Sequence, residues 1–359
     1  MNLSLDNIIF SLQRGGGVSV VWIEHIKRLL RDSRFSPFFY EYNDALSNYM
    51  RREITIPESQ VCKISNLFFP IKRYVNFRSH GKDPFIFHSS YYRIDNNPNA
   101  RNVTTVHDFV YEKYMSGIRK KIHSSQKWKS IKEADAIICI SDSTKMDLLH
   151  YLPQIDENKI HVIHNGVSDE YKQITHDQYK LNLHYGTGGF ALYVGVRHVP
   201  YKNFNTAVQI CKELKIPLVT VGGEPYSSEE LSKLDILLGK GNYVGLRGIT
   251  NSELNELYNR ALVLLYPSLY EGFGIPVLEA QRCGCPVLCM KSSSIPEIVG
   301  DTDLCFGIDS TIGEMCEAVK SIKNDIYRKQ EIERGLKNAE RFSWDRTYRE
   351  TADIYCSLL

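Results

Sequence analysis

The sequence has no apolar run close to the ~18 residues that a helix needs to cross a bilayer. Its first residues, MNLSLDNIIFSLQ, also lack the basic start and long apolar stretch of a secretory signal peptide. We therefore expect a cytoplasmic protein. Contact with the inner face of the plasma membrane would depend on the basic residues of the chain.

The sequence also lacks the usual patterns of disulfides and metal sites. Its nine cysteines are scattered, and most have apolar neighbours, where a free thiol behaves as a small apolar side chain. Cys283 and Cys285 are one residue apart, and no second close Cys or His pair completes four tetrahedral ligands. We predict neither a disulfide framework nor a bound metal.

A strong net charge is missing as well, since 44 Lys and Arg balance 42 Asp and Glu to give +2. This balance argues against nucleic acid as a partner. Between Lys113 and Lys132, however, no acidic residue occurs, and apolar and aromatic residues are interleaved with basic ones. The candidates for contact with a membrane or acceptor are Arg119, Lys120, Lys121, Lys127, Trp128 and Lys129. The segment fits an anionic membrane surface, and it equally fits a solvated helix face.

The length of 359 residues predicts two domains, each with its own core. Apolar runs of strand length alternate with amphipathic stretches, which is typical of parallel sheets covered by helices on both faces. The fold class is therefore α/β. We expect one domain at 1–170 and a second at 190–343, joined by a polar linker.

Individual elements follow from the same pattern. In the first half we expect strands at 7–12, 84–88, 102–106, 136–140 and 161–164, and a helix at 18–30. In the second half we expect strands at 191–194, 217–221, 243–246, 262–266 and 286–290. Helices at 205–214, 228–238, 252–260 and 276–281 alternate with them, and the tail from 313 is expected to be helical.

The richest candidate site is the segment SLYEGFGIPVLEAQRCGCPV at 268–287. A glycine-bearing turn follows a strand there, and Pro276 suits the first turn of a helix. The backbone amides at this helix N-terminus, a favourable place for an anion, belong to Gly272, Phe273, Gly274 and Ile275. Glu271 and Glu279 would face one crevice, where a carboxylate can bind ribose hydroxyls. The same spacing would also occur if Glu271 were only a helix-capping residue and Glu279 only a surface residue.

Two cations form a second candidate site. Arg197 and Lys202 follow a strand that ends at Gly195, and they lie five residues apart in a loop. A diphosphate needs such a pair, because Arg binds bidentately and Lys supplies a compact charge. Two basic residues of a solvent-exposed loop that binds no ligand would give the same sequence pattern.

Two weaker signals come from the first half. Gly15, Gly16 and Gly17 lie before a helix, as in a loop that approaches a phosphate closely, but they match neither a dinucleotide fingerprint nor a P-loop. His107 and Asp108 directly follow a strand, and hence lie at a catalytic edge of the first sheet. A single histidine is more often packed than functional.

Together these residues resemble a family-4 retaining glycosyltransferase of the GT-B architecture, over essentially the whole chain. The resemblance rests on Glu271 and Glu279 within EGFGIPVLEA, on GCPV and on SSIPEIVG at 293–300. It also rests on the two cations, the glycine loop, His107 with Asp108, and IHNGV at 163–167. The resemblance implies two Rossmann-like domains facing across a cleft, with a closing helix at 344–359 that returns to the first domain.

The resemblance also implies roles for these residues. The second domain would hold a nucleotide sugar, with Glu279 on the ribose, Arg197 and Lys202 on the diphosphate, and Glu271 with the nearby amides on the sugar. The three glycines would approach the phosphates from the first domain, and His107 would contact the sugar near the reacting centre. No metal and no further cofactor would be required, since the two cations stabilise the departing diphosphate.

Other activities remain open. A sugar-nucleotide epimerase or a phosphorylase has a similar architecture, and a sugar-binding or scaffold protein without turnover is a third reading. For a glycosyltransferase, the donor would be GDP-mannose or else a UDP-hexose. The acceptor would be a glycan, with a lipid-linked sugar in lipopolysaccharide O-chain or capsule assembly suggested by the basic segment.

Overall fold

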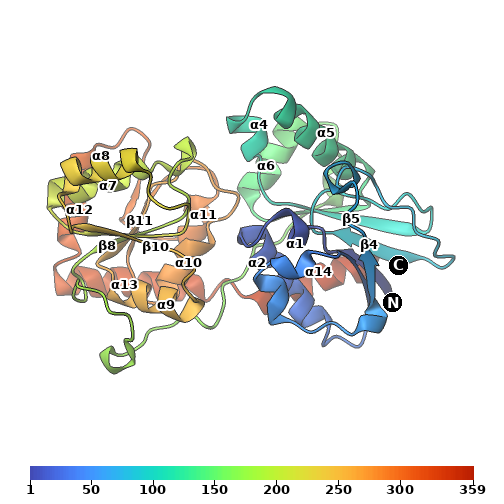
Figure 1. The fold of residues 1–359 in the computed structure, drawn as a ribbon, viewed down its shortest axis with the longest axis horizontal. Coiled ribbons are helices and arrows are strands. Elements are labelled where there is room, and N and C mark those ends of the chain that lie inside the picture. Colours follow the sequence, from blue (N-terminus) through green and yellow to red (C-terminus); the bar gives the residue numbers. More distant parts are fainter. The chain divides into compact units, whose positions relative to one another are not determined.

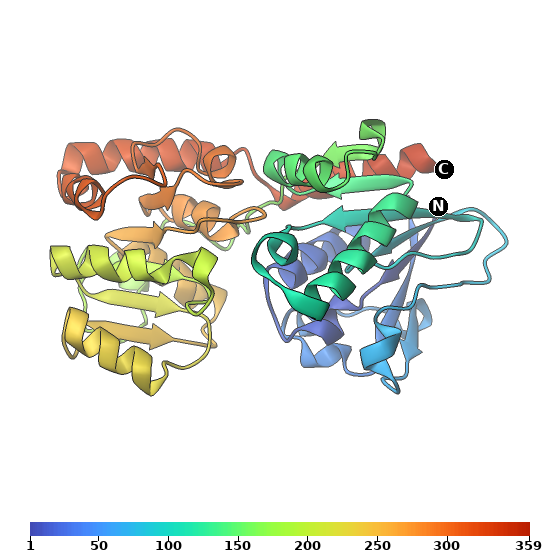
Figure 2. The same cartoon turned by 90° about the horizontal axis from the view of Figure 1, so that it is seen from above.

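The computed structural model describes all residues from Met1 to Leu359. The chain divides into two compact units, one formed by Met1–Gly166 with Trp344–Leu359 and the other by Val167–Ser343. Both are parallel sheets covered by helices, and the strands of each sheet run side by side (Figures 1 and 2). No helix of the chain has the length and apolar character needed to span a membrane.

The first unit is built on seven parallel strands in the order β3-β2-β1-β4-β5-β6-β7. The strands are β1 (Asn2–Asp6), β2 (Ser36–Tyr42), β3 (Val61–Ile64), β4 (Phe85–Ser89), β5 (Ala100–Val106), β6 (Ala136–Cys139) and β7 (Ile160–Val162). Its helices are α1 (Ile9–Leu12), α2 (Gly17–Leu29), α3 (Phe69–Lys72), α4 (Val110–Tyr114), α5 (Gly117–Glu133), α6 (Asp142–Tyr151) and α14 (Trp344–Leu358).

The two faces of this sheet are covered by different helices (Figure 1). Trp22 of α2 and Tyr355 of α14 belong to the same buried apolar cluster as Val103 of β5. The next residue of β5, Thr104, points the other way, and its hydroxyl lies 2.7 Å from that of Ser130 on α5. Side chains alternate along a strand, so α2 and α14 cover one face and α5 covers the other.

The C-terminal helix is fixed to the first unit by a buried polar network. The hydroxyl of Tyr355 lies 2.6 Å from Nδ1 of His88 and 3.0 Å from Nε2 of His25. The hydroxyl of Thr347 donates to the backbone oxygen of His164 at 2.7 Å. These contacts join residues that are more than 180 positions apart in the chain. The last helix is therefore part of the first unit.

The second unit is built on six parallel strands in the order β10-β9-β8-β11-β12-β13. The strands are β8 (Ala191–Val194), β9 (Leu218–Val221), β10 (Tyr243–Leu246), β11 (Val263–Tyr266), β12 (Val287–Met290) and β13 (Cys305–Phe306). Its helices are α7 (Phe204–Leu214), α8 (Ser228–Leu238), α9 (Asn251–Arg260), α10 (Ile275–Arg282), α11 (Ile295–Val299), α12 (Ile312–Ser321) and α13 (Asp325–Ala339). Figure 1 shows α7, α8 and α12 on one face and α9, α10 and α13 on the other.

Short 3-10 turns connect several of these elements: Ala45–Ser47, Met50–Glu53, Glu58–Gln60, Glu157–Lys159, His176–Gln178 and Pro200–Lys202. The polar segment that was expected to link the domains, 168–189, belongs to the second unit. Its backbone is held by side chains of α9. The backbone amide of Lys180 donates to Glu256 at 2.7 Å, and Arg260 donates to the oxygen of Leu181 at 2.9 Å.

The structure corrects the expected start of the first sheet. The expected strand at 7–12 is wrong, because β1 is Asn2–Asp6 and the apolar residues after it form the short helix α1. Asn7 directly follows the strand, and its side chain donates to Glu41 of β2 and accepts from the indole of Trp22. Two further strands, β2 and β3, were not expected from the sequence.

Candidate functional site

The turn between β11 and α10 carries the richest group of expected site residues. Gly274 caps α10 with φ at 111°, a left-handed conformation that favours glycine, and a proline occupies the first turn. The helix begins at Ile275, so the backbone amides of the turn and of the first helical residues lie at its N-terminus. The expected strand, turn and helix are confirmed here.

Serines from the loop after β12 hold this turn in place. The backbone amide of Glu271 donates to the hydroxyl of Ser293 at 2.8 Å. The hydroxyl of the fully buried Ser294 lies 3.0 Å from the backbone oxygen of Glu271 and 2.8 Å from that of Phe273. The shape of the turn is thus fixed by side chains that reach across from the neighbouring strand.

Glu271 and Lys202 form an ion pair within the second unit. The Lys202 ammonium lies 2.6 Å and 2.8 Å from the two carboxylate oxygens of Glu271. Both side chains are mostly buried, at 18 % and 12 % exposure. Lys202 was expected on the diphosphate of a donor and Glu271 on its sugar, and the two side chains are in direct contact.

Arg197 has a different set of partners. Its guanidinium donates to the backbone oxygen of Gly222 at 2.9 Å, and its Nε lies 3.5 Å from a carboxylate oxygen of Glu230. It also stacks over the ring of Tyr226, 4.2 Å from the ring centre. These partners follow β9 or belong to α8, and Arg197 lines a cavity of about 600 Å³ beside them. The contacts bring Lys202 together with Glu271, and they hold Arg197 against the loop after β9.

Glu279 lies on α10 among aromatic hydroxyls. Tyr258 of α9, itself fully buried, donates to Oε2 of Glu279 at 2.8 Å. Burial raises the pKa of Glu279 to about 7, while hydrogen bonds from Tyr258 and Tyr171 act in the opposite direction. The two tyrosines were not expected from the sequence. They lie 21 and 108 positions before Glu279, counted from the residue numbers, with no motif that links them to it.

His107 of the first unit follows β5 and is 9 % exposed. It lines a small cavity of about 30 Å³ together with His88 and His25. Burial, with a smaller contribution from Lys127, lowers the pKa of His107 to about 4. The imidazole is therefore neutral near pH 7.

The glycine loop lies immediately before α2, which begins at Gly17. Gly16 has φ at 156°, a conformation that favours glycine, and a Cβ atom there would also lie 2.9 Å from Oε1 of the flexible Gln13 side chain. A Cβ on Gly15 would come 3.3 Å from the ring of Tyr49, whereas at Gly17 nothing lies within 4 Å. The steric demand for glycine is strongest at the middle position.

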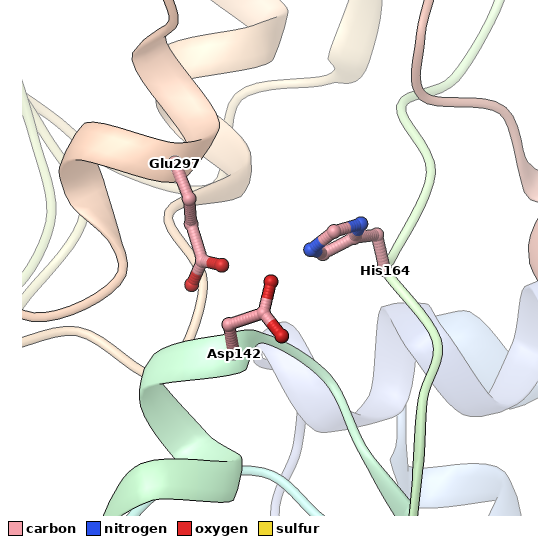
Figure 3. A group of neighbouring side chains, drawn as sticks. All are labelled: Asp142, His164 and Glu297. Carbon is pink, nitrogen blue, oxygen red and sulfur yellow. The ribbon is translucent and has the colours of Figure 1, made fainter.

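A histidine and a carboxylate of the first unit lie close together (Figure 3). Asp142 begins α6 and His164 follows β7, and their ligand atoms lie within 4.8 Å of each other. Glu297, also drawn in Figure 3, belongs to α11 of the second unit. Within the first unit the pair offers two ligand atoms, whereas a structural zinc site needs four.

The basic segment needs one correction. Lys127 was expected on a membrane-facing or acceptor-facing patch, but its side chain is fully buried. Its ammonium lies 2.8 Å from a carboxylate oxygen of Glu112 and 2.8 Å from the backbone oxygen of Asp108. Lys127 therefore fastens α5 to α4. The ion pair satisfies a charge that would otherwise be costly to bury.

The other basic residues of α5 lie at or near the surface. Arg119, Lys121 and Lys129 are exposed, and Lys120 and Trp128 are partly exposed. A surface trough of about 840 Å³ runs along the helix, and its lining includes Lys120, Lys121, Trp128 and Lys129.

Comparison with known proteins places the chain in a family. Residues 177–338 match the profile of "Glycosyl transferases group 1", and residues 15–171 match that of "Glycosyltransferase Family 4". The chain is a family-4 glycosyltransferase of the GT-B architecture. This confirms the resemblance seen in the sequence, including its fold class.

This glycosyltransferase is similar to "O-antigen chain mannosyltransferase B" of Escherichia coli, with 28 % identity over 71 % of the chain and 70 % of the relative. It is 24 % identical to the "Serotype-specific mannosyltransferase WbdA" of Escherichia coli over 72 % of the chain, but it spans only 34 % of that longer protein. Its fold matches the crystal structure of HepE from Anabaena in complex with UDP and glucose, with a TM-score of 0.76 at 16 % identity. That match covers 99 % of the chain and all of HepE.

Proposed function

We propose that this glycosyltransferase moves a hexose from a nucleotide diphosphate sugar to a sugar hydroxyl of a glycan acceptor, with retention at the anomeric carbon. The observation that carries the proposal is the Lys202–Glu271 ion pair beside the N-terminus of α10. It places an ammonium, a carboxylate and oriented backbone amides at one edge of a parallel sheet. These groups match the diphosphate and the hydroxyls of such a donor.

The ion pair suggests how the donor enters. A diphosphate is a stronger partner for an ammonium than one carboxylate, so Lys202 would move from Glu271 to the diphosphate. Glu271 would then be free to accept hydrogen bonds from the hydroxyls of the sugar. Because the serines at 293 and 294 hold its backbone, the carboxylate would keep its place during this exchange.

Arg197 would supply the second positive charge. In the structure it binds the backbone oxygen of Gly222, and a rotation about its side-chain bonds is needed to reach a diphosphate. As the bond between sugar and phosphate breaks, negative charge grows on the leaving diphosphate. Two cations and the end of α10 would stabilise that charge most strongly in the transition state. The leaving phosphate would itself take the proton of the acceptor hydroxyl.

The remaining roles fall to Glu279, to the glycine loop and to His107. Tyr258 and Tyr171 hydrogen-bond the carboxylate of Glu279, whose two oxygens have further lone pairs for the hydroxyls of a ribose. His107 is neutral near pH 7, so it would hold a sugar hydroxyl by a hydrogen bond and add no positive charge. Gly15, Gly16 and Gly17 would let the backbone before α2 approach the donor phosphates closely.

For the donor we favour GDP-mannose. The similarity to mannosyltransferases of Escherichia coli supports this choice, and one of them is described as an O-antigen chain enzyme. A UDP-hexose is the second candidate, since HepE shares the fold and is seen with UDP and glucose. The same relatives support a place in bacterial surface polysaccharide synthesis, as in O-chain or capsule assembly.

The acceptor would be a lipid-linked glycan held by the first unit at the inner face of the plasma membrane. Basic residues of α5 support this, because the trough that includes Lys120, Lys121, Trp128 and Lys129 suits an anionic surface. Changing Lys120, Lys121 and Lys129 to Glu should lower co-sedimentation with anionic vesicles. Equal binding of the variant and the wild type would contradict the membrane contact. Lys127 is left unchanged because it is buried.

Transfer is tested with GDP-mannose and UDP-glucose in separate reactions containing a soluble oligosaccharide acceptor. We expect nucleoside diphosphate release only when both donor and acceptor are present, which separates a transferase from an epimerase. The anomeric proton of the product should show the same configuration as the donor by NMR. An inverted product would contradict retention. Turnover should persist in excess EDTA, and a loss restored by one metal ion would contradict the proposed charge stabilisation.

A further inference from the structure

The first unit carries an apolar loop at 66–75, which lies outside the basic segment and contains α3. Leu67 and Phe68 are each 64 % exposed, and Ile71 is 67 % exposed. Tyr74 and Val75 add further exposed apolar surface, at 43 % and 56 %. Soluble proteins seldom expose so many large apolar side chains within ten residues, and such a patch usually marks an interaction surface.

The loop is held firmly in this exposed state. Phe69 points inward and packs edge-on against Tyr42, with 4.7 Å between ring centres. The side-chain amide of Gln126 on α5 donates to the backbone oxygen of Arg73 at 2.9 Å. Phe68 has φ at 62°, a left-handed conformation that is costly for a large side chain. The outward residues are therefore presented by a fixed scaffold.

The exposed apolar surface continues onto α5. Ile118 and Ile122 are 68 % and 42 % exposed and lie four residues apart, on one side of the helix. Gln126, which holds the loop, lies a further four residues on, so this side of α5 is next to the loop. Lys121, also exposed, lies three residues after Ile118 and hence next to it on the helix surface. Apolar side chains from two elements thus lie beside basic ones.

The charge around this surface favours one partner. Residues 66–82 contain Lys72, Arg73, Arg78 and Lys82 and no acidic residue. The basic segment 113–132 also contains no acidic residue. Apolar side chains surrounded by basic ones suit the headgroup region of an anionic bilayer, where each Lys or Arg near the surface adds to the attraction. A second copy of this chain is a poorer partner, because two such basic surfaces facing each other would repel.

We infer that the apolar loop is a membrane wedge, whose Leu67, Phe68 and Ile71 side chains enter the headgroup and acyl boundary of an anionic bilayer. The basic face of α5 then holds the headgroups beside it. The inference rests on the proposed lipid-linked acceptor, since it assigns the contact that brings the first unit to such a substrate.

The direct test replaces Phe68 by Trp. Of the three native tryptophans, Trp22 and Trp344 are 4 % exposed, so any change that vesicles cause in the fluorescence of the wild type comes mainly from Trp128. With phosphatidylglycerol vesicles, we expect a blue shift of the added fluorescence in F68W and its quenching by brominated lipid. The matched control is Ile236→Trp on α8, which is 82 % exposed and should show neither effect. An F68W signal that is unchanged, or equal to the control, overturns the inference.

A second variant measures affinity. Changing Leu67 and Ile71 to Asp should weaken binding to phosphatidylglycerol vesicles by tenfold or more, because two large apolar side chains no longer leave water on binding. Leu46→Asp, at a position that is 53 % exposed, should bind like wild type. Both variants should transfer sugar to a soluble acceptor normally. Unchanged vesicle binding of the double variant, or a dimer in solution that this variant dissociates, overturns the wedge.

These outcomes are separable from the proposed function. If no donor and acceptor pair supports transfer by the wild type, the proposed reaction fails while the vesicle result still decides the wedge. If transfer is normal and the fluorescence of F68W shows no contact with lipid, the proposed reaction is supported and the membrane wedge is contradicted.

Discussion

The hydroxyl of Tyr258 lies 2.8 Å from Oε2 of Glu279, within the second unit and one helix away. Tyr258 is completely buried, and its own pKa is raised well above the usual value, mainly by burial, so it remains a hydrogen-bond donor. The bond fixes one oxygen of a carboxylate that burial would otherwise protonate readily. Tyr258 is therefore a positioning residue for the proposed ribose contact.

Removing this hydroxyl should move the pH dependence of nucleotide binding. The pKa of Glu279 is about 7, so affinity for UDP or GDP should fall as the pH decreases from 8 to 6 and the carboxylate is protonated. The bond from Tyr258 lowers that pKa, so in Tyr258→Phe the midpoint should shift to higher pH. Affinity at pH 7 should drop by about tenfold. Calorimetric titration across this pH range measures both effects.

Glu279→Gln is the control, because it cannot ionise. The affinity of this variant for the nucleotide should change with pH only to the extent that the protonation of the nucleotide phosphates changes. If wild type and Glu279→Gln show the same pH profile, the carboxylate does not contact the nucleotide.

Replacing Lys202 by Met should lower kcat by roughly 10² to 10³, because a preorganised charge at the leaving group is lost. Glu271 also loses its partner at 2.6 Å, so the KM for the donor should rise. Lys240→Met removes an exposed lysine of the same unit and should leave both constants unchanged. Similar kinetics for the two variants would exclude Lys202 from the reaction. Steady-state assays of nucleoside diphosphate release decide the matter.

Ser294→Ala should loosen the turn that carries Glu271. The hydroxyl at this fully buried position donates to the backbone oxygens of Glu271 and Phe273, and its loss leaves these oxygens with fewer hydrogen-bond donors. We expect a loss of about 1 to 3 kcal/mol in the free energy of unfolding. The KM for the donor should rise more than kcat falls. Urea unfolding and donor titration test the two parts, and a wild-type KM would show that the clamp has no bearing on the donor.

Acid should destabilise the first unit through its buried histidines. Burial lowers the pKa of His25 to about 3 and that of His107 to about 4, and it keeps the pKa of His88 well below the usual value. Below pH 6.5 the unfolded chain therefore binds protons that the folded unit does not. Each neutral imidazole then removes up to about 1.4 kcal/mol of stability per pH unit. Urea unfolding at pH 7.5, 6 and 5 should show this decline, and a flat profile would contradict it.

The elements of the second unit were predictable because each short apolar run is bounded by clear breakers. The strands at 191–194 and 243–246 and the helix at 228–238 have the expected bounds. In the first unit the run Ile8–Phe10 has strand-like composition but forms part of a short helical turn, since periodicity does not distinguish the two over a few residues. The strand lies earlier, at Asn2–Asp6, where it pairs with β2 and β4.

The residue types of the candidate site were also predictable, but their contacts were not. Glu271 and Lys202 are 69 positions apart, and only the sheet order brings their side chains together. The burial of Lys127 could not be predicted from the sequence, because its partner, Glu112, lies on a different helix outside the basic segment. Apolar side chains lie on both the buried and the exposed sides of α5. The sequence pattern therefore did not indicate which face of the helix is buried.

The most direct test of the account is a crystal structure of the protein with a bound nucleoside diphosphate, GDP or UDP. We predict that the diphosphate lies within hydrogen-bond distance of the Lys202 ammonium and the first amides of α10, with Glu279 on the ribose. Arg197 should have turned from Gly222 toward the phosphates. A diphosphate bound away from Lys202 and from the turn at 271–275 would contradict the proposed donor site.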